Sequence, residues 1–206
     1  MAIKNILFDL GNVLFRLDLP RWNREVQALL HPVHPLELQE AAQDYETGRI
    51  STELFINAVL AKCHHSRQAI DVLQVWNSML IGFVPEYLKV LDTLKKDYQV
   101  YLLSNNNPLH QQWVYQELEH KYGILDFNER FFHATFYSHE IGVSKPHEDS
   151  FDQVIQQTGL CPEETIYFDD DPHNIATGRT LGFQAVLVKN ADHTLELLAQ
   201  HRLVRT

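Results

Sequence analysis

The chain has 206 residues, of which 45% are hydrophobic, and its formal net charge at pH 7 is -10. This length and composition argue against disorder and predict one domain, or one domain with an insertion, around a substantial core. The acidic balance argues against a nucleic-acid binder, because affinity for a phosphate backbone depends on clustered cations. A small anion can still bind at a local site.

The N-terminal stretch and the cysteines bear on location. After Lys4 the apolar run is short and is interrupted by Asp9, so it predicts neither a signal peptide nor a membrane span. Cys63 and Cys161 lie far apart and form no metal-binding pair, which favours reduced thiols. We therefore expect a cytoplasmic protein that does not bind membranes, with a monomer as the default state.

The first predicted element is a strand over Asn5–Leu10. Its nearly continuous apolar run is typical of a strand that is buried on both faces of a parallel sheet. A lone carboxylate, Asp9, lies near the end of the run, and the chain then turns at Gly11. An acid in this position predicts a functional side chain.

Residues 16–83 show helical patterns only. We expect helices around Arg21–Leu30, Leu36–Thr47, Thr52–Lys62 and Arg67–Leu80, with Ser51 as the N-cap of the third. The segment is therefore predicted to be a helical cap domain, inserted after the first strand. The core domain would then comprise residues 1–15 and 84–206.

Strands and helices alternate in the rest of the chain. The predicted strands are Gln99–Ser104, Phe131–Ser138, Thr165–Asp169 and Gln184–Lys189, and the predicted helices are Pro108–Tyr122, Pro146–Thr158 and Asn174–Leu181. This alternation predicts an α/β fold with a doubly wound parallel sheet.

Polar side chains gather at the predicted carboxyl ends of these strands, where ligands bind in open parallel sheets. They are Asp9, Ser104, Asn105, Lys145, Asp169 and Asp170. Neighbouring carboxylates repel one another unless a cation is present, and oxygen ligands favour Mg²⁺. A metal beside a carboxylate, a hydroxyl, an amide and a lysine suits phosphoryl transfer, which depends on positioning and charge neutralisation.

Four segments carry a resemblance to a known family. FDLGNV, LLSNNN, GVSKP and YFDDD resemble, in this order, the four motifs of the haloacid dehalogenase-like hydrolases, with a helical cap after the first motif. The resemblance spans the chain and implies a Rossmann-like core with strand order 3-2-1-4-5. It also implies a magnesium-dependent phosphatase that acts on a small phosphorylated metabolite, such as a sugar phosphate.

The resemblance further implies a role for each motif residue. Asp9 would attack phosphorus and become an aspartyl-phosphate, a covalent route that divides one difficult step into two. The metal would be held by Asp9, the Gly11 carbonyl, Asp169 and Asp170, and the phosphate by Ser104, Asn105 and Lys145. Lys145 would also pair with Asp9. The roles of His173 and Asn174, beside the fourth motif, stay open.

Gly11 departs from the family pattern, in which a second aspartate usually stands at this position and protonates the leaving group. Such a general acid contributes about 10²–10⁴ in rate. Three explanations remain open. The chain can belong to the branch that begins FDLGNV and resembles bacterial α-glucose-1-phosphate phosphatases, whose hemiacetal leaving group is acidic and needs less protonation. It can instead be a metal-independent 2-haloacid dehalogenase, or a catalytically weakened binding or regulatory protein.

Overall fold

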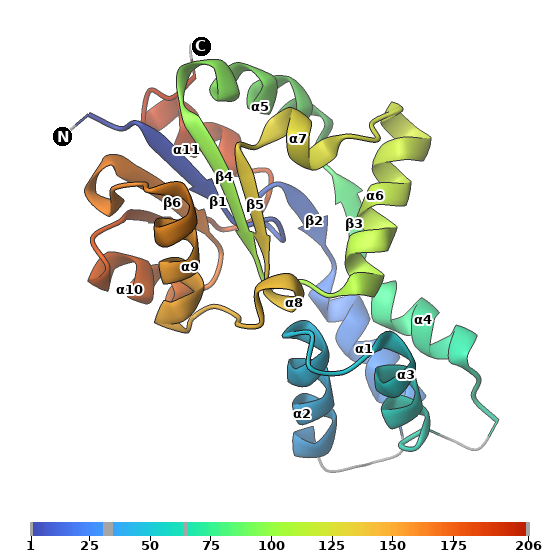
Figure 1. The fold of residues 1–206 in the computed structure, drawn as a ribbon. Helices are drawn as coiled ribbons and strands as arrows, with labels where there is room; N and C mark the ends of the chain where they lie inside the picture. The colour runs from blue at the N-terminus through green and yellow to red at the C-terminus, as the bar shows by residue number, and fades with distance from the viewer. Residues whose placement is uncertain (1, 31–34, 64–65, 205–206) are drawn as a thin grey trace.

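The computed structural model describes residues 2–30, 35–63 and 66–204. A parallel sheet of five strands lies at its centre, with the order β5-β4-β1-β6-β7 (Figure 1). The strands are β1 (Asn5–Phe8), β4 (Gln99–Ser104), β5 (Ala134–Tyr137), β6 (Thr165–Asp169) and β7 (Gln184–Leu187). Numbered within this sheet the order is 3-2-1-4-5, so the predicted fold is confirmed.

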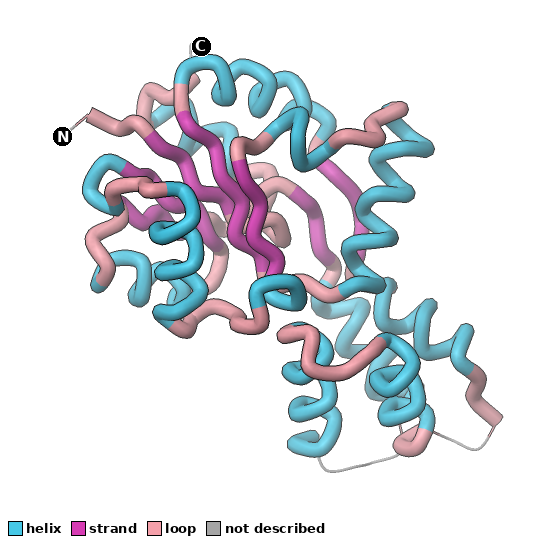
Figure 2. The backbone as a smooth tube through the Cα atoms, in the orientation of Figure 1, coloured by secondary structure: helices cyan, strands magenta, loops and turns pink. Residues whose placement is uncertain are grey.

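Helices cover both faces of the sheet, which lies between them in Figure 2. Side chains of α5 (Pro85–Asp97), α6 (Pro108–Tyr122), α7 (Phe127–Phe131) and α11 (Thr194–Gln200) pack into one buried cluster, and those of α9 (Glu148–Thr158) and α10 (Pro172–Thr180) into another. Strand β1 alternates between the two clusters, because Ile6 and Phe8 enter the first and Leu7 enters the second. The near-continuous apolar runs of the strands are thereby explained.

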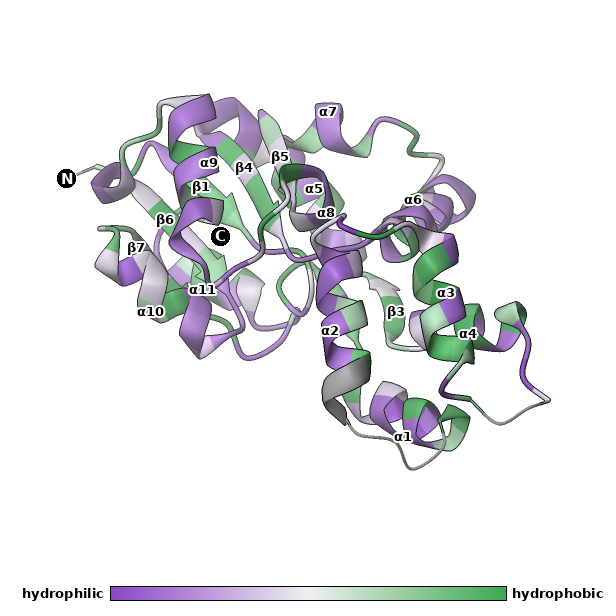
Figure 3. Cartoon of the chain, turned by 60° about the horizontal axis from the view of Figure 1, so that its bottom comes forward, coloured by the Kyte–Doolittle hydropathy of each residue, from purple (hydrophilic) through white to green (hydrophobic). Residues whose placement is uncertain are grey.

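Four helices form a separate bundle beside the carboxyl ends of the strands (Figure 1). They are α1 (Leu19–Leu29), α2 (Pro35–Glu46), α3 (Thr52–Leu60) and α4 (Ala69–Asn77). Figure 3 shows hydrophobic and hydrophilic residues interspersed along these helices, as expected for amphipathic elements. As predicted, the Ser51 hydroxyl caps α3 by accepting a hydrogen bond from the Leu54 amide at 3.2 Å.

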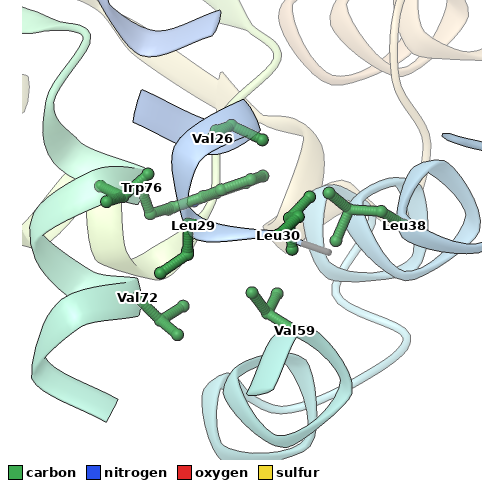
Figure 4. A pocket seen from close by; sticks show the side chains of 8 residues that line it. Val26, Leu29, Leu30, Leu38, Val59, Val72 and Trp76 are labelled. Carbon is green, nitrogen blue, oxygen red and sulfur yellow. The ribbon is translucent and has the colours of Figure 1, made fainter. Parts of the chain in front are cut away.

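The bundle has its own apolar core. In Figure 4, side chains from α1, α2, α3 and α4 surround a small cavity, and Leu29, Val59, Val72 and Trp76 belong to the buried cluster of the bundle. The cavity holds only about 10 Å³. The helices therefore pack closely without help from the sheet.

Residues 16–83 are not all helical, which corrects the prediction. Strand β2 (Phe15–Leu17) pairs antiparallel with β3 (Leu80–Phe83), and the last helix of the bundle ends at Asn77. Both Phe15 and Phe83 are buried in the core of the sheet domain, with their rings 6.1 Å apart. Strands this short give no readable periodicity. The resulting two-stranded ribbon carries both passages of the chain between the sheet domain and the bundle.

The ends of several other elements also differ from the prediction. Helix α9 begins at Glu148 and α10 at Pro172, and β5 covers only Ala134–Tyr137. The short helix α8 (Ser138–Ile141) and a 3₁₀ turn (Pro162–Glu164) complete the elements. Within the described ranges, no helix combines the length and apolarity that crossing a bilayer requires.

Candidate active site

The sheet brings the predicted site residues to one edge. Asp9 directly follows β1, Ser104 ends β4 and Asp169 ends β6, and the register pairs Phe8 with both Leu102 and Phe168. Because these strands are parallel neighbours, their last side chains meet at the carboxyl edge. The fourth group, Lys145, comes from the loop between α8 and α9 and is almost fully buried, with 4% of its surface exposed.

Lys145 joins two of the carboxylates. Its Nζ donates hydrogen bonds at 2.6 Å to Asp9 Oδ1 and at 2.6 Å to Asp169 Oδ2. Burial by itself lowers the pKa of Lys145, but the carboxylates of Asp169 and Asp9 more than offset it, and the net shift is upward. The lysine therefore stays protonated and holds a fixed positive charge beside Asp9.

The surroundings of Asp9 disfavour its ionised form. Burial raises its pKa to about 7, with further increases from Asp169 and Asp170, although Lys145 acts in the opposite direction. Its backbone N–H donates to the Phe168 carbonyl at 2.9 Å, which fixes the position of the carboxylate at the strand end. A buried carboxylate with an elevated pKa and a lysine partner is typical of a reactive group.

Asp169 is committed to holding this arrangement. The carboxamide of Asn174 donates to both of its oxygens at 3.0 and 3.1 Å, the Asp171 amide donates to Oδ1 at 2.8 Å, and the Tyr167 hydroxyl donates to Oδ2. The side chain is fully buried. The sequence did not single out Tyr167, and it left Asn174 open. In the structure, Tyr167 and Asn174 orient the Asp169 carboxylate that binds Lys145.

Asn105 and Ser104 differ in their surroundings. The Asn105 carboxamide accepts from the Lys145 amide at 2.8 Å and donates to the Lys145 carbonyl at 2.9 Å, so it fixes the lysine backbone across 40 residues of sequence. The Ser104 hydroxyl lies 3.5 Å from the Asn105 carbonyl, a weak hydrogen bond that a phosphate oxygen can replace. Of the two predicted phosphate ligands, Ser104 has the freer side chain.

A cleft of about 90 Å³ adjoins the site. Gly11, Ser104 and Asn105 line one side of it, and apolar side chains near the ribbon, such as Met79, line another. His110 also lines the cleft and anchors the bundle, because its Nε2 bonds to a backbone carbonyl of α4 at 3.0 Å. Burial lowers the pKa of His110 to about 4, despite an opposing effect of that bond.

Comparison with known proteins identifies the family. The family model of the haloacid dehalogenase-like hydrolases matches residues 3–182. The chain belongs to this family. The predicted resemblance is thus confirmed, whereas the FDLGNV branch within the family stays a prediction.

Relatives of this haloacid dehalogenase-like (HAD-like) hydrolase include a phosphatase. The chain is 31% identical over 214 residues to D-ribitol-5-phosphate phosphatase of Bacteroides thetaiotaomicron, covering 95% of this chain and 97% of the relative. The family and this relative confirm the prediction of an enzyme of the HAD-like phosphatase class.

Solved structures of a HAD family enzyme from Bacteroides thetaiotaomicron share the whole fold. Its magnesium complex has a TM-score of 0.86 and 27% identity, covering 97% of this chain and 100% of that one. Its complex with magnesium and inorganic phosphate has a TM-score of 0.80 and 28% identity, covering 95% and 99%.

The charges of the HAD-like site fit a magnesium ion. The carboxylates of Asp9 and Asp169 bind the ammonium of Lys145, and Asp170 is close enough to interact with them electrostatically, so the excess negative charge calls for a further cation. In the part of the chain that the structure describes, no three His, Cys, Asp or Glu side chains converge as a metal site. Mg²⁺ needs only one or two protein carboxylates, since waters and carbonyls complete its shell.

The predicted metal ligands are not equally available. Asp170 is half-buried, and burial raises its pKa while a hydrogen bond at 2.9 Å from Asn12 Nδ2 acts against that rise. Asn12 holds this position with a φ of 52°, and sequence reasoning missed it. The oxygens of Asp169 already accept several hydrogen bonds, so Asp170 has the more available carboxylate of the fourth motif.

Gly11 has no conformational reason to be glycine, because its φ is not in the left-handed region. A Cβ at this position would lie 3.0 Å from Leu17 Cδ1 and 3.9 Å from Asp9 Oδ2. A small movement of the flexible leucine would make room for a side chain. Neither the backbone conformation nor the available space therefore explains why position 11 lacks an acid.

His173 is exposed, and its backbone amide donates a hydrogen bond to the Asp171 carboxylate at the start of α10.

Proposed function

We propose that this HAD-like hydrolase is a magnesium-dependent phosphatase for a small sugar or sugar-alcohol phosphate, and that the reaction passes through an aspartyl-phosphate on Asp9. The observation that carries the proposal is the buried bridge of Lys145 between Asp9 and Asp169. The substrate class is supported by the relative that is named as a D-ribitol-5-phosphate phosphatase.

In the first step the Asp9 carboxylate attacks phosphorus and the ester oxygen leaves. Lys145 favours the ionised form of Asp9 and neutralises charge on the phosphoryl oxygens, because its ammonium is fixed beside the reacting group. Ser104 donates its hydroxyl to a phosphate oxygen. Asp169, Asn174 and Asn105 take no part in bond making, but they hold the lysine in place.

In the second step water attacks the aspartyl-phosphate and restores the Asp9 carboxylate. When bound to Asp9, Asp170 and the Gly11 carbonyl, Mg²⁺ would supply additional charge neutralisation. The bundle lies beside the strand ends, in the position to restrict access to the site and to select among esters.

The test is phosphate release from a panel of phosphomonoesters, with Mg²⁺ or with EDTA, by the wild type, Asp9→Asn and Asp92→Asn. Asp92 is a matched control, because it is an exposed aspartate paired with Arg130. We expect turnover by the wild type and Asp92→Asn in Mg²⁺, and its loss with EDTA or in Asp9→Asn. Activity that survives Asp9→Asn would refute the mechanism. Halide release from 2-haloacids without phosphate release would favour the dehalogenase, and neither activity would favour a binding protein.

A further inference from the structure

With glycine at position 11, the first motif has no second acid to protonate the leaving oxygen of the ester. In a phosphoryl transfer the entering and leaving oxygens lie roughly in line through phosphorus. The leaving oxygen therefore faces away from Asp9, and the attacking water of the second step later occupies the same place. A single acid facing that place can serve both steps, and the side that faces away from the sheet is the side of the helical bundle (Figure 1).

Glu46 is the last residue of α2 and lies at this rim. Its backbone carbonyl accepts a hydrogen bond from the Ser138 hydroxyl at 2.7 Å, and the same hydroxyl lies 2.9 Å from the amide and 3.0 Å from the carbonyl of Asn106. Asn106 directly follows the two predicted phosphate ligands. One serine therefore ties the end of α2 to the loop that forms the phosphate site.

The turn that follows α2 packs directly against helix α8. Gly48 has a φ of +68°, and a Cβ there would lie 2.2 Å from the His139 carbonyl oxygen. No larger residue fits between the chain after α2 and helix α8. The position of Glu46 is thus set by direct backbone packing, independently of its own side chain.

The Glu46 carboxyl has no hydrogen-bond or ion-pair partner within the described ranges and lies within electrostatic range of Lys145. It is half-buried. Burial raises its pKa, and Lys145 is near enough to act against that rise. The other titratable groups on elements packed against α2 are His139 and Glu140 of α8 and Glu53 of α3.

We propose that Glu46 is the general acid and base of this HAD-like hydrolase, in the role that residue 11 leaves empty. The inference rests on the proposed function, and it extends the catalytic machinery to the bundle. In the first step the Asp9 oxygen bonds to phosphorus, the phosphorus–ester oxygen bond breaks, and Glu46 gives its proton to the departing alkoxide. In the second step water bonds to phosphorus and loses a proton to Glu46, the phosphorus–Asp9 bond breaks, and inorganic phosphate leaves.

The test compares leaving groups of different acidity in Glu46→Gln. A leaving group that needs protonation, as in ribitol 5-phosphate or glucose 6-phosphate, depends on the acid, whereas p-nitrophenolate leaves without it. We expect kcat/KM to fall about 10²–10⁴-fold for the sugar phosphates and less than about tenfold for p-nitrophenyl phosphate. Because the second step loses its base, p-nitrophenolate should appear as a burst of about one equivalent per enzyme.

Glu40→Gln is the matched control, since Glu40 is an exposed glutamate on the same helix. It should behave as the wild type, and thermal melting should show that both variants are folded. An equal fall for both classes of ester, or no fall for either, would overturn the role of Glu46. The proposed function fails separately, if the wild type hydrolyses none of the esters or if Asp9→Asn remains active.

Discussion

Lys145 is the residue on which the electrostatics of the site depend most strongly. Replacing it with Met keeps much of the side-chain volume but leaves Asp9 and Asp169 without the ammonium that lies 2.6 Å from each. Breaking a buried ion pair by removing one partner costs about 3–5 kcal/mol. Since domains are stable by only about 5–15 kcal/mol, Lys145→Met should lose a large part of its free energy of unfolding in the absence of metal.

The loss should depend on pH in a known direction. The pKa of Asp9 is about 7 in the folded protein, above its ordinary value of 3.8, so its protonation stabilises the fold at low pH and this contribution is lost as pH rises through 7. Without Lys145 the folded pKa of Asp9 rises further, and each additional unit is worth about 1.4 kcal/mol. The deficit of the variant should therefore be smaller at pH 5 than at pH 8.

Urea denaturation in EDTA at both pH values measures this difference for the wild type, Lys145→Met and Lys4→Met. Lys4 is an exposed control that pairs with Glu164 at the surface, and its variant should stay near the wild type. A Lys145→Met protein as stable as the wild type at pH 8, or one with the same deficit at both pH values, would refute the reasoning.

Three further predictions concern single groups. Burial lowers the pKa of His110 to about 4, so the folded state resists its protonation. In denaturant unfolding, the free energy of unfolding of the wild type should fall by about 2 kcal/mol more than that of His110→Gln between pH 7 and pH 5. Identical pH dependence would count against burial as the cause. In a Glu46→Gln background, Gly11→Asp places an acid near Asp9, and steady-state assays should show turnover of ordinary sugar phosphates rising relative to anomeric phosphates. An unchanged ratio would argue that protonation is not limiting. Asn12→Ala removes the 2.9 Å bond to Asp170 and should weaken Mg²⁺ binding about 10–100-fold in calorimetry, whereas unaltered affinity would exclude a positioning role.

The sheet was readable from the sequence because its strands are buried on both faces and therefore apolar throughout. The alternation of strands and helices gave the fold class, while the strand order came from the family resemblance. The two ribbon strands were missed because three or four residues, such as Phe15–Leu17, are too few to display a period. Both ends of Pro108–Tyr122 were predicted, and several other helix ends shifted by one to three residues, which reflects local capping rather than any change of fold.

The site was readable at the level of motifs but not of partners. Asp9, Ser104, Lys145 and Asp169 lie at strand ends or beside them, and parallel pairing alone brings them together. The clamp of Asn105 on the Lys145 backbone depends on tertiary packing across distant segments, so no local pattern reports it. The same holds for Glu46, whose place is decided by the contact of the bundle with α8.

The ribbon of β2 and β3 has a consequence for how such enzymes can diversify. Because Phe15 and Phe83 are paired neighbours, the chain leaves the sheet domain and returns to it at almost the same point. Everything between them is a cassette with one point of entry and exit, so its helices can be exchanged as a unit provided that the contacts of α2 with α8 and of α4 with His110 are kept. Since this cassette also carries Glu46, such an exchange would alter proton transfer together with substrate choice.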